Sequence, residues 1–370
     1  MAKSVHRYRT VVTAVAVVAG LLARLLTASA GDNYDMESWW IASEGVLRGE
    51  PVYAATHRYN YGPLWSYCIG ALRWVSAATG PDTITRLHLF MTTLLTLPDL
   101  LLAYILSRTV GWQVGVLFFL NPISCFVTGY HVQFDNLAIV LGIVSWIVFQ
   151  GASSRRSLFL AAVLLGASLS IKHVFAPFLA WIPLCSMIRN LSARVVYLGA
   201  ALVIFIASFA PWVGDPEVWA SIQRNVFEYR STEGYTVTSI VASWLGVSAR
   251  QLFILLTIAA GCVLVRFTNL QRFAPQLYLL ALVGFSSGMA RNYLAIPLIA
   301  VFAHRSAWPA QAYLLIGTLA FVTVNTNLGS TEVAYALLTT PLVSYELCQL
   351  LLLGTFISVL RSAARSRVQQ

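Results

Sequence analysis

The chain has 370 residues, of which 58% are apolar and only 10% are charged, and its mean hydropathy is +0.73. Because soluble domains carry about 25% charged residues, this composition excludes an ordinary soluble protein and indicates one embedded in lipid. The net charge of +10 fits basic cytoplasmic loops and contact with anionic lipids better than nucleic-acid binding.

Apolar runs of about the length that crosses a bilayer recur along the whole chain. The first run is longer than the apolar core of a signal peptide and many more follow it, so it is expected to span the membrane. The runs cover residues 11–30, 87–107, 111–128, 134–150, 157–171, 174–188, 195–213, 250–265, 275–290, 292–304, 309–325 and 335–360. They predict an all-α integral membrane protein with about 12 transmembrane helices, forming one polytopic domain over residues 1–370.

The connecting segments favour one orientation. With a cytoplasmic N-terminus, every inner segment carries Lys or Arg and none carries Asp or Glu, which is the positive-inside bias. Those segments are residues 1–10, Arg108, 151–157, 189–194, 266–272, Arg305 and the C-terminal tail. Both termini are therefore expected in the cytoplasm, with the plasma membrane as the location in a bacterium.

Residues 31–86 form a first external loop that is too long for a plain connector. Its first part gathers five acids at residues 32–50, whereas only Asp99 and Glu346 of the chain's 14 acids fall inside a predicted span away from its edge. Residues 33–47 and 61–75 each carry a Trp-containing apolar stripe that predicts an interfacial amphipathic helix. Residues 214–248 form a second external loop.

Polar residues recur at the expected external ends of the helices. Because ionisable groups at membrane depth are costly unless they line a cavity or pair with one another, their grouping on one side predicts a shared site. The segments concerned are Asp32 with Asp35, GYHVQFDN at 129–136, SIKHVF at 170–175, QRNVFEYR at 223–230 and GMARNY at 288–293.

The order of these landmarks resembles the GT-C superfamily, which comprises multi-span glycosyltransferases that use polyprenyl-phosphate sugars. GDNYDMESWW at 31–40 is similar to the start of the first external loop in the endoplasmic reticulum glucosyltransferases of N-glycan assembly. RGEPVYAATHRYNYGPLW at 48–65 resembles the first GPI-anchor mannosyltransferase and bacterial polyprenyl-dependent mannosyltransferases. HVQFDN at 131–136, followed by Lys172 and His173, is similar to patterns in the glucosyltransferases and their bacterial relatives.

The resemblance implies transfer of a hexose, with mannose or glucose favoured, to a lipid-linked or cell-envelope glycan, with inversion. Such a transfer needs a base for the acceptor hydroxyl, and Asp32 holds the superfamily position, with Asp35 orienting the acceptor. The alternative for either acid is an N-cap of the following helix. Asp32 and Asp35 stand three residues apart rather than as the Asp-x-Asp of some relatives, which weakens the case for a metal without excluding a divalent cation; no cofactor is otherwise expected.

Basic residues are candidates for binding the donor phosphate, because charge-assisted hydrogen bonds suit it. They are Lys172, His173, Arg224, Arg230 and Arg291. The alternative for each is a side chain that reaches toward lipid headgroups. The candidates for binding sugar hydroxyls are His131, Gln133, Asp135, Asn136 and Tyr61, with a capped turn at a helix start as the alternative for the first four.

Two charged residues are expected to have other roles. Arg24 is expected to reach toward headgroups or to pair with an acid, and Asp99 to be a buried polar partner without a catalytic role. Two other classes of function also remain open, namely a transporter or lipid-linked-glycan flippase and a non-catalytic subunit of a glycan-assembly complex. The absence of matching halves speaks against a transporter.

Overall fold

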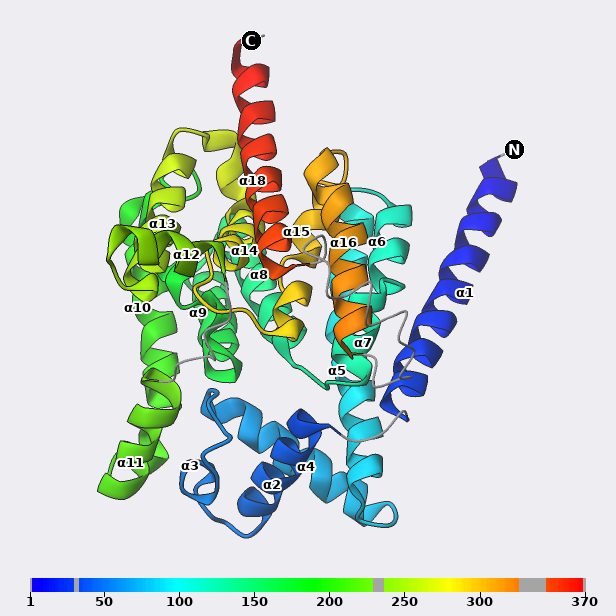
Figure 1. Cartoon of the computed structure of the whole chain (residues 1–370), viewed down its shortest axis with the longest axis vertical. Helices are drawn as coiled ribbons and strands as arrows, with labels where there is room; N and C mark the ends of the chain where they lie inside the picture. Colours follow the sequence, from blue (N-terminus) through cyan, green and yellow to red (C-terminus); the bar gives the residue numbers. More distant parts are fainter. Residues whose placement is uncertain (1, 30–32, 229–235, 326–343, 369–370) are drawn as a thin grey trace. The chain divides into compact units, whose positions relative to one another are not determined.

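The computed structural model describes residues 2–29, 33–228, 236–325 and 344–368, and this part of the chain is helical (Figure 1). Four of its helices are long and apolar enough to cross a membrane. They cover Tyr8–Ala28, Ile84–Thr109, Leu191–Trp212 and Tyr345–Ser366. Three bent helix pairs raise the number of possible spans to seven if each pair counts as one. The expected all-α class with membrane-spanning helices is thus supported, whereas the count of twelve spans is not.

The difference in span number arises where apolar runs form short, broken helices. The run at 111–128 is split into Trp112–Phe119 and Pro122–Gly129, bent by 47°. The run at 174–188 is a series of short 3-10 turns, which begins at a 109° bend after Arg155–Ile171. An apolar run predicts burial or contact with lipid, but it does not require one straight helix of membrane length.

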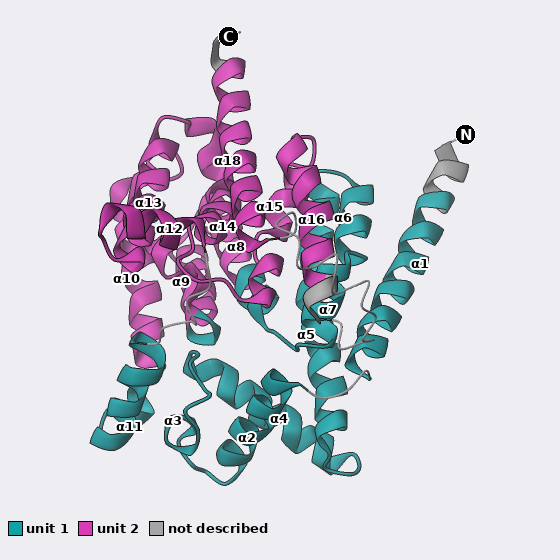
Figure 2. Ribbon diagram, in the orientation of Figure 1, with its two compact units in different colours: residues 1–140, 170–172, 208–229 teal, residues 141–169, 173–207, 230–370 magenta. Residues whose placement is uncertain are grey.

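The chain divides into two compact units (Figure 2). The first comprises residues 1–140, 170–172 and 208–229, and the second comprises residues 141–169, 173–207 and 230–370. The single domain expected over residues 1–370 stays a prediction. Helices α8 (Asp135–Gly151) and α9 (Arg155–Ile171) contribute to both units.

The first unit holds the segments that the sequence predicts to be functional. Its helices are α1 (Ala2–Ala28), α2 (Tyr34–Leu47), α3 (Val52–Ala55), α4 (Pro63–Ala78), α5 (Ile84–Thr109), α6 (Trp112–Phe119), α7 (Pro122–Gly129) and α11 (Pro216–Ile222), with a 3-10 turn η4 (Ala210–Trp212) and a π-helical turn η5 (Gln223–Phe227). Helices α2 and α4 occupy the two stretches expected to be helical in the first loop. Their place at the membrane surface stays a prediction.

Short polar side chains set where these helices begin. Asn33 and Asn121 accept hydrogen bonds from backbone N–H groups in the first turns of α2 and α7, and Thr83 does the same for α5. Such N-caps satisfy donors that have no partner within the helix, and each contributes about 1 kcal/mol. Pro122 follows Asn121 at the first helical position, where its missing N–H costs nothing.

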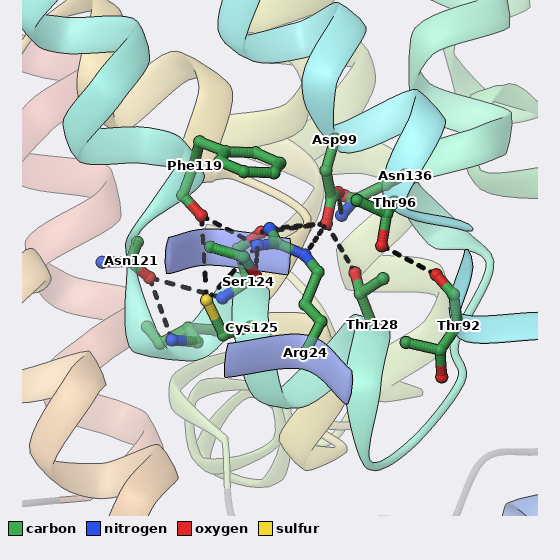
Figure 3. Close-up of polar contacts among 12 residues, drawn as sticks. Arg24, Thr92, Thr96, Asp99, Phe119, Asn121, Ser124, Cys125, Thr128 and Asn136 are labelled. Carbon is green, nitrogen blue, oxygen red and sulfur yellow. Dashed lines mark hydrogen bonds and ion pairs between the residues drawn. The ribbon is translucent and has the colours of Figure 1, made fainter. Parts of the chain in front are cut away.

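A buried ion pair joins the spans of the first unit (Figure 3). Arg24 of α1 donates from Nε and Nη2 to Asp99 Oδ2 of α5, at 3.0 and 2.8 Å, and both side chains are fully buried. The remaining Arg24 donors reach Ser124 and the carbonyls of Gly20 and Phe119. Pairing is thus the alternative that holds for Arg24, and the prediction of Asp99 as a buried partner is confirmed.

Other polar groups saturate the Asp99 carboxylate. Oδ2 accepts from the hydroxyls of Ser124 and Thr128, and Oδ1 accepts from the Asn136 amide. A buried charge is tolerated only when it is paired and fully hydrogen-bonded. This network therefore fixes α1, α5, α7 and the start of α8 against one another.

The second unit is also helical. Its elements are η1 (His173–Phe175), η2 (Pro177–Ala180), η3 (Ile182–Leu184), α10 (Leu191–Ala207), α12 (Val237–Leu245), α13 (Ala249–Val265), η6 (Thr268–Phe273), α14 (Ala274–Gly284), η7 (Arg291–Ala295), α15 (Leu298–Ala303), α16 (Trp308–Asn325) and α18 (Tyr345–Val368). Helix α18 packs against α14 and α16. Gln349 of α18 donates to the carbonyls of Val283 and Ser286 at the end of α14, which gives those groups the partners that the helix cannot supply.

Candidate functional site

The loop between α7 and α8 has an unusual backbone. Val132 has φ +45° and is fully buried. A β-branched residue rarely adopts this left-handed conformation, which costs of order 1–3 kcal/mol and persists only where the surroundings impose it. The loop carries His131 and Gln133 on either side of Val132 and ends at Asp135. The strained residue therefore lies among three side chains that the sequence predicts to bind sugar hydroxyls, namely His131, Gln133 and Asp135.

The N-terminus of α2 is joined to this loop. Asn33 caps α2 by accepting from the N–H groups of Asp35 and Met36, and its side-chain amide donates to the carbonyl of Tyr130. Asp35 is therefore not the cap of the helix. Its carboxylate is free to make a different contact, and Oδ2 lies 3.4 Å from Nδ1 of His131.

The Asp35–His131 pair is the part of the site that meets solvent. The side chain of Asp35 is 33% exposed and that of His131 is 12% exposed. Asp35 also stands in the first turn of α2, where the helix dipole favours a negative charge. The contact thus holds an ionisable pair at a place that a dissolved or membrane-borne hydroxyl can reach.

A second ion pair joins Asp135, four residues after His131, to Lys172. Nζ of Lys172 lies 2.8 Å from Oδ2 of Asp135 and 3.4 Å from the Gln133 side-chain oxygen. Asp135 is fully buried and Lys172 is 8% exposed. Lys172 therefore does not reach toward lipid headgroups. Among the described residues its ammonium has these two hydrogen-bond partners, which leaves one of its three N–H donors for a ligand oxygen.

Aromatic rings surround the Lys172 ammonium. Nζ lies 5.1 Å from the ring centre of Tyr61 and 5.2 Å from that of Phe134, which is within the range of cation–π attraction. Phe134 stacks on Trp65 and meets Trp39 edge-on. These contacts bring the first loop and the segment before α8 together around one charged group.

Two buried tyrosine hydroxyls hydrogen-bond to the backbone of the turn that carries Tyr61. Tyr53 donates to the carbonyl of Tyr61 and Tyr59 donates to that of Gly62, at 2.8 and 2.6 Å. Burial raises the pKa of both phenols above the ordinary value, so both remain donors. Gly62 itself approaches the backbone of Ser170 so closely that a Cβ there would overlap the carbonyl group.

Three buried polar atoms in this cluster have no hydrogen-bond partner among the described residues. They are Oδ1 of Asp135 and the indole nitrogens of Trp39 and Trp65. An unsatisfied buried donor or acceptor costs about 1–3 kcal/mol. Asp135 adjoins Lys172, and the rings of Trp39 and Trp65 both pack on Phe134. Ordered water or the hydroxyl groups of a ligand would satisfy these three atoms.

The remaining predicted site residues have other contacts or fall outside the described residues. Asn136 donates to Asp99 in the interior of the first unit. His173 and Arg291 belong to the second unit, where the Arg291 side chain hydrogen-bonds to Tyr345. Arg224 lines a separate groove beside α3. Asp32 and Arg230 lie outside the described residues.

Reasoning from the sequence overlooked several members of the site. Asn33 carries a recognisable signal, since Asn directly before a helix with acids in its first turn is typical of an N-cap. Trp39, Trp65 and Phe134 carry no comparable signal, because aromatic residues are equally common in a core and at a membrane interface.

Among the residues with described positions, no three His, Cys, Asp or Glu side chains are grouped so that they could hold a metal ion. Comparison of the chain with known protein families, with curated proteins and with solved structures finds no match. The likeness to the GT-C superfamily therefore stays a prediction.

Proposed function

We propose that this chain is an integral membrane glycosyltransferase that moves a hexose from a polyprenyl phosphate to a lipid-linked or cell-envelope glycan. Its partners are then the bilayer, the lipid-linked donor and the glycan acceptor, and its site lies on the external face. The fold supports the membrane part of this proposal through its long apolar helices. The transfer reaction is inferred from the site.

The observation that carries the proposal is the joining of two segments. The first loop contacts two segments that are distant in sequence, and all of these residues lie in one compact unit. Asp35 contacts His131 of the 130–135 loop, and the ring of Tyr61 lies near the ammonium of Lys172. Sugar transfer from a phosphate requires a base for the acceptor hydroxyl and a cation for the phosphate. The solvent-accessible carboxylate is suited to the first task, and the lysine beside buried hydrogen-bonding groups is suited to the second.

The reaction assigns a role to each group. The acceptor hydroxyl oxygen attacks the anomeric carbon while Asp32 takes its proton. The bond from that carbon to the phosphate oxygen breaks, and its electron pair leaves on that oxygen with the polyprenyl phosphate. Asp35, held by His131, orients the acceptor. The remaining N–H of Lys172 binds an oxygen of the donor, and the unpartnered Asp135 oxygen accepts from a sugar hydroxyl.

The buried ion pair favours an enzyme over a transporter. A transporter needs charged groups that change partners along a pathway near the middle of the membrane. Arg24 and Asp99 lie within α1 and α5 but are fully buried, with protein groups on each of their polar atoms. Their saturation suits a fixed structural contact.

The test is turnover by the purified chain in detergent or nanodiscs with synthetic polyprenyl-phosphate mannose and glucose and a panel of lipid-linked acceptors. Transfer to at least one acceptor is expected, with loss of activity in Asp32→Asn. Folded protein without turnover across the panel would contradict the proposal. Substrate movement across sealed vesicles without sugar transfer would favour the transporter.

A further inference from the structure

A groove of about 610 Å³ lies in the first unit, beside α3 and α11, and it is separate from the loop of residues 130–135. Its lining consists of Ala54, Glu217, Ala220, Ser221, Gln223, Arg224 and Glu228. Figure 1 shows α3 next to α11, and the two helices pack against each other. Sites for small molecules commonly have volumes of roughly 300–1,000 Å³, so the groove is large enough for a ligand.

The helical repeat explains why these side chains face the groove together. Val218, Ile222 and Val226 recur every four residues and are buried. The residues on the opposite face are therefore turned outward, and they include Glu217, Arg224 and Glu228, at spacings of seven and four. Asp215 begins the helix by accepting from the N–H groups of Glu217 and Val218.

The helix changes type where it meets the groove. After α11 the chain continues as the π-helical turn η5, which carries Gln223 and Arg224. Such turns are rare and occur frequently at functional sites, because the extra residue alters the direction of the side chains. Gln223 and Arg224 of the groove thus lie in a π-helical turn rather than in a regular α-helix.

The wall on the α3 side is held in place by aromatic packing. Tyr53, the neighbour of Ala54, is 2% exposed and meets the ring of Trp212 edge-on at 5.4 Å. It also packs against Phe209, at 6.3 Å between ring centres. Because Tyr53 joins α3 to the segment before α11, the position of the groove is fixed by buried side chains rather than by the exposed residues that line it.

The charges in the lining indicate the kind of ligand. Glu217 and Glu228 flank one cation, Arg224, which donates to the Ser221 hydroxyl at 3.3 Å. With two carboxylates and one guanidinium, the described residues of the lining carry a net negative charge, which disfavours an anion. The binding of a donor phosphate by Arg224 is therefore not the role that its surroundings favour. Carboxylates, an amide and a guanidinium side by side offer both acceptors and donors to hydroxyl groups.

We propose that this groove binds a neutral, hydroxyl-rich glycan. The two glutamates accept from its hydroxyls, and Arg224 and Gln223 donate to its oxygens. Small side chains at Ala54 and Ala220 leave room for the sugar ring. If the chain is the glycosyltransferase proposed above, the groove holds the acceptor glycan; that part of the inference rests on the proposed function, whereas binding itself does not.

The experiment measures binding without any donor. Full-length protein in nanodiscs is titrated with soluble neutral oligosaccharides built from mannose, glucose, galactose or arabinose, by saturation-transfer NMR and calorimetry. Saturable binding of at least one oligosaccharide is expected. It should change little between low and high salt, because a neutral ligand makes no long-range charge attraction. No binding across the panel, or binding only of a polycationic peptide, would overturn the proposal.

Two variants place the ligand in the groove. Ala220→Trp fills it without changing its charge, and the exposed position of Ala220 lets the fold accept the larger ring. Arg224→Ala removes the donor. Each should raise the Kd at least tenfold. The matched controls are Ala364→Trp and Arg250→Ala, exposed residues of the second unit, and both should bind like the wild type.

The outcomes separate this inference from the proposed function. Binding that is lost in Ala220→Trp, in a protein that never transfers a sugar, would support the groove and contradict the transferase. Turnover with wild-type affinity and wild-type rates in both groove variants would overturn the groove and leave the transferase intact. Unchanged thermal unfolding of the variants shows that a loss of binding does not arise from misfolding.

Discussion

Lys172 binds one oxygen of Asp135, and the other oxygen of the same buried carboxylate has no hydrogen-bond partner among the residues that the structure describes. The pair therefore combines a fixed contact with an unused acceptor. Gln133 and two aromatic rings complete the surroundings of the lysine. An arrangement of this kind holds a charge in place and still leaves hydrogen-bonding capacity for a ligand.

Removing one member of this pair should destabilise the fold. Lys172→Met leaves Asp135 as a buried charge without a partner, which costs about 3–5 kcal/mol. The double variant Lys172→Met with Asp135→Leu should recover much of that loss, because no charge is left buried. Equilibrium unfolding in mixed micelles measures both. Arg48→Ala is the control, since Arg48 pairs with Glu44 at an exposed site and should change stability by no more than about 1 kcal/mol. Equal stability of the Lys172→Met and Arg48→Ala proteins would contradict a buried ion pair at Lys172.

Variants of Asn33 and Asp35 should distinguish a role in helix capping from a role in sugar transfer. Asn33→Ala removes the cap of α2 and should lower stability by about 0.5–2 kcal/mol, whereas Asn33→Asp should preserve it. Asp35→Asn should leave stability nearly unchanged, because Asp35 is not the cap, and should reduce transfer. The measurements are thermal unfolding and turnover of the same preparations. Strong destabilisation by Asp35→Asn would show that its contact with His131 is chiefly structural.

Asp32→Asn should lower transfer by about two or more orders of magnitude, because it removes the basic carboxylate that takes the acceptor proton. Donor binding should remain, and Asp35→Asn should cost less activity. Single-turnover kinetics with bound donor makes the comparison. Near-normal transfer in both variants would contradict the proposed mechanism in its central step.

The Arg24–Asp99 pair should be required for folding. Asp99→Leu leaves the Arg24 guanidinium buried without its carboxylate and should reduce the yield of monodisperse protein and lower its Tm, at a cost of about 3–5 kcal/mol. Arg24→Met combined with Asp99→Leu should restore part of the loss. Size-exclusion chromatography and thermal unfolding report the effect. A fully stable Asp99→Leu protein would be inconsistent with the network in Figure 3.

Gly62→Ala should disturb the turn that carries Tyr61. The φ of Gly62 is −69°, so alanine carries no backbone penalty there, and the effect arises only from the overlap of its Cβ with the Ser170 carbonyl. Lower thermal stability and weaker donor use are expected. Gly214→Ala is the matched control in the same unit, because no atom lies near its added Cβ. Equal behaviour of the two variants would contradict the close approach.

Reporter fusions test the orientation of the chain in the membrane. A reporter fused after Gly80 is expected to behave as external, and one fused after Gln370 as cytoplasmic, in accordance with the basic inner segments. The reverse pattern would place Asp35 and His131 on the cytoplasmic face and remove the external donor from the proposal.

The sequence alone determined that this protein is helical and has segments long and apolar enough to cross a membrane, because composition and long apolar runs depend little on which residues contact one another. It also indicated the helices at 34–47 and 63–78, whose apolar stripes follow the helical repeat. Only the tertiary structure decided how many apolar runs form helices of membrane length. An apolar run is equally compatible with lipid contact and with a short, bent helix inside the protein.

Partner choice was likewise decided by the tertiary structure. Arg24 and Asp99 are 75 residues apart, and Asp135 and Lys172 are 37 apart. No local pattern connects either pair, because their contacts arise only when separate helices pack. The same applies to Arg224, which the sequence predicts to bind a phosphate and which lines a groove together with two glutamates in the fold. Residue type restricts the chemistry that a position can perform, whereas the neighbours supplied by packing decide which part of that chemistry is available.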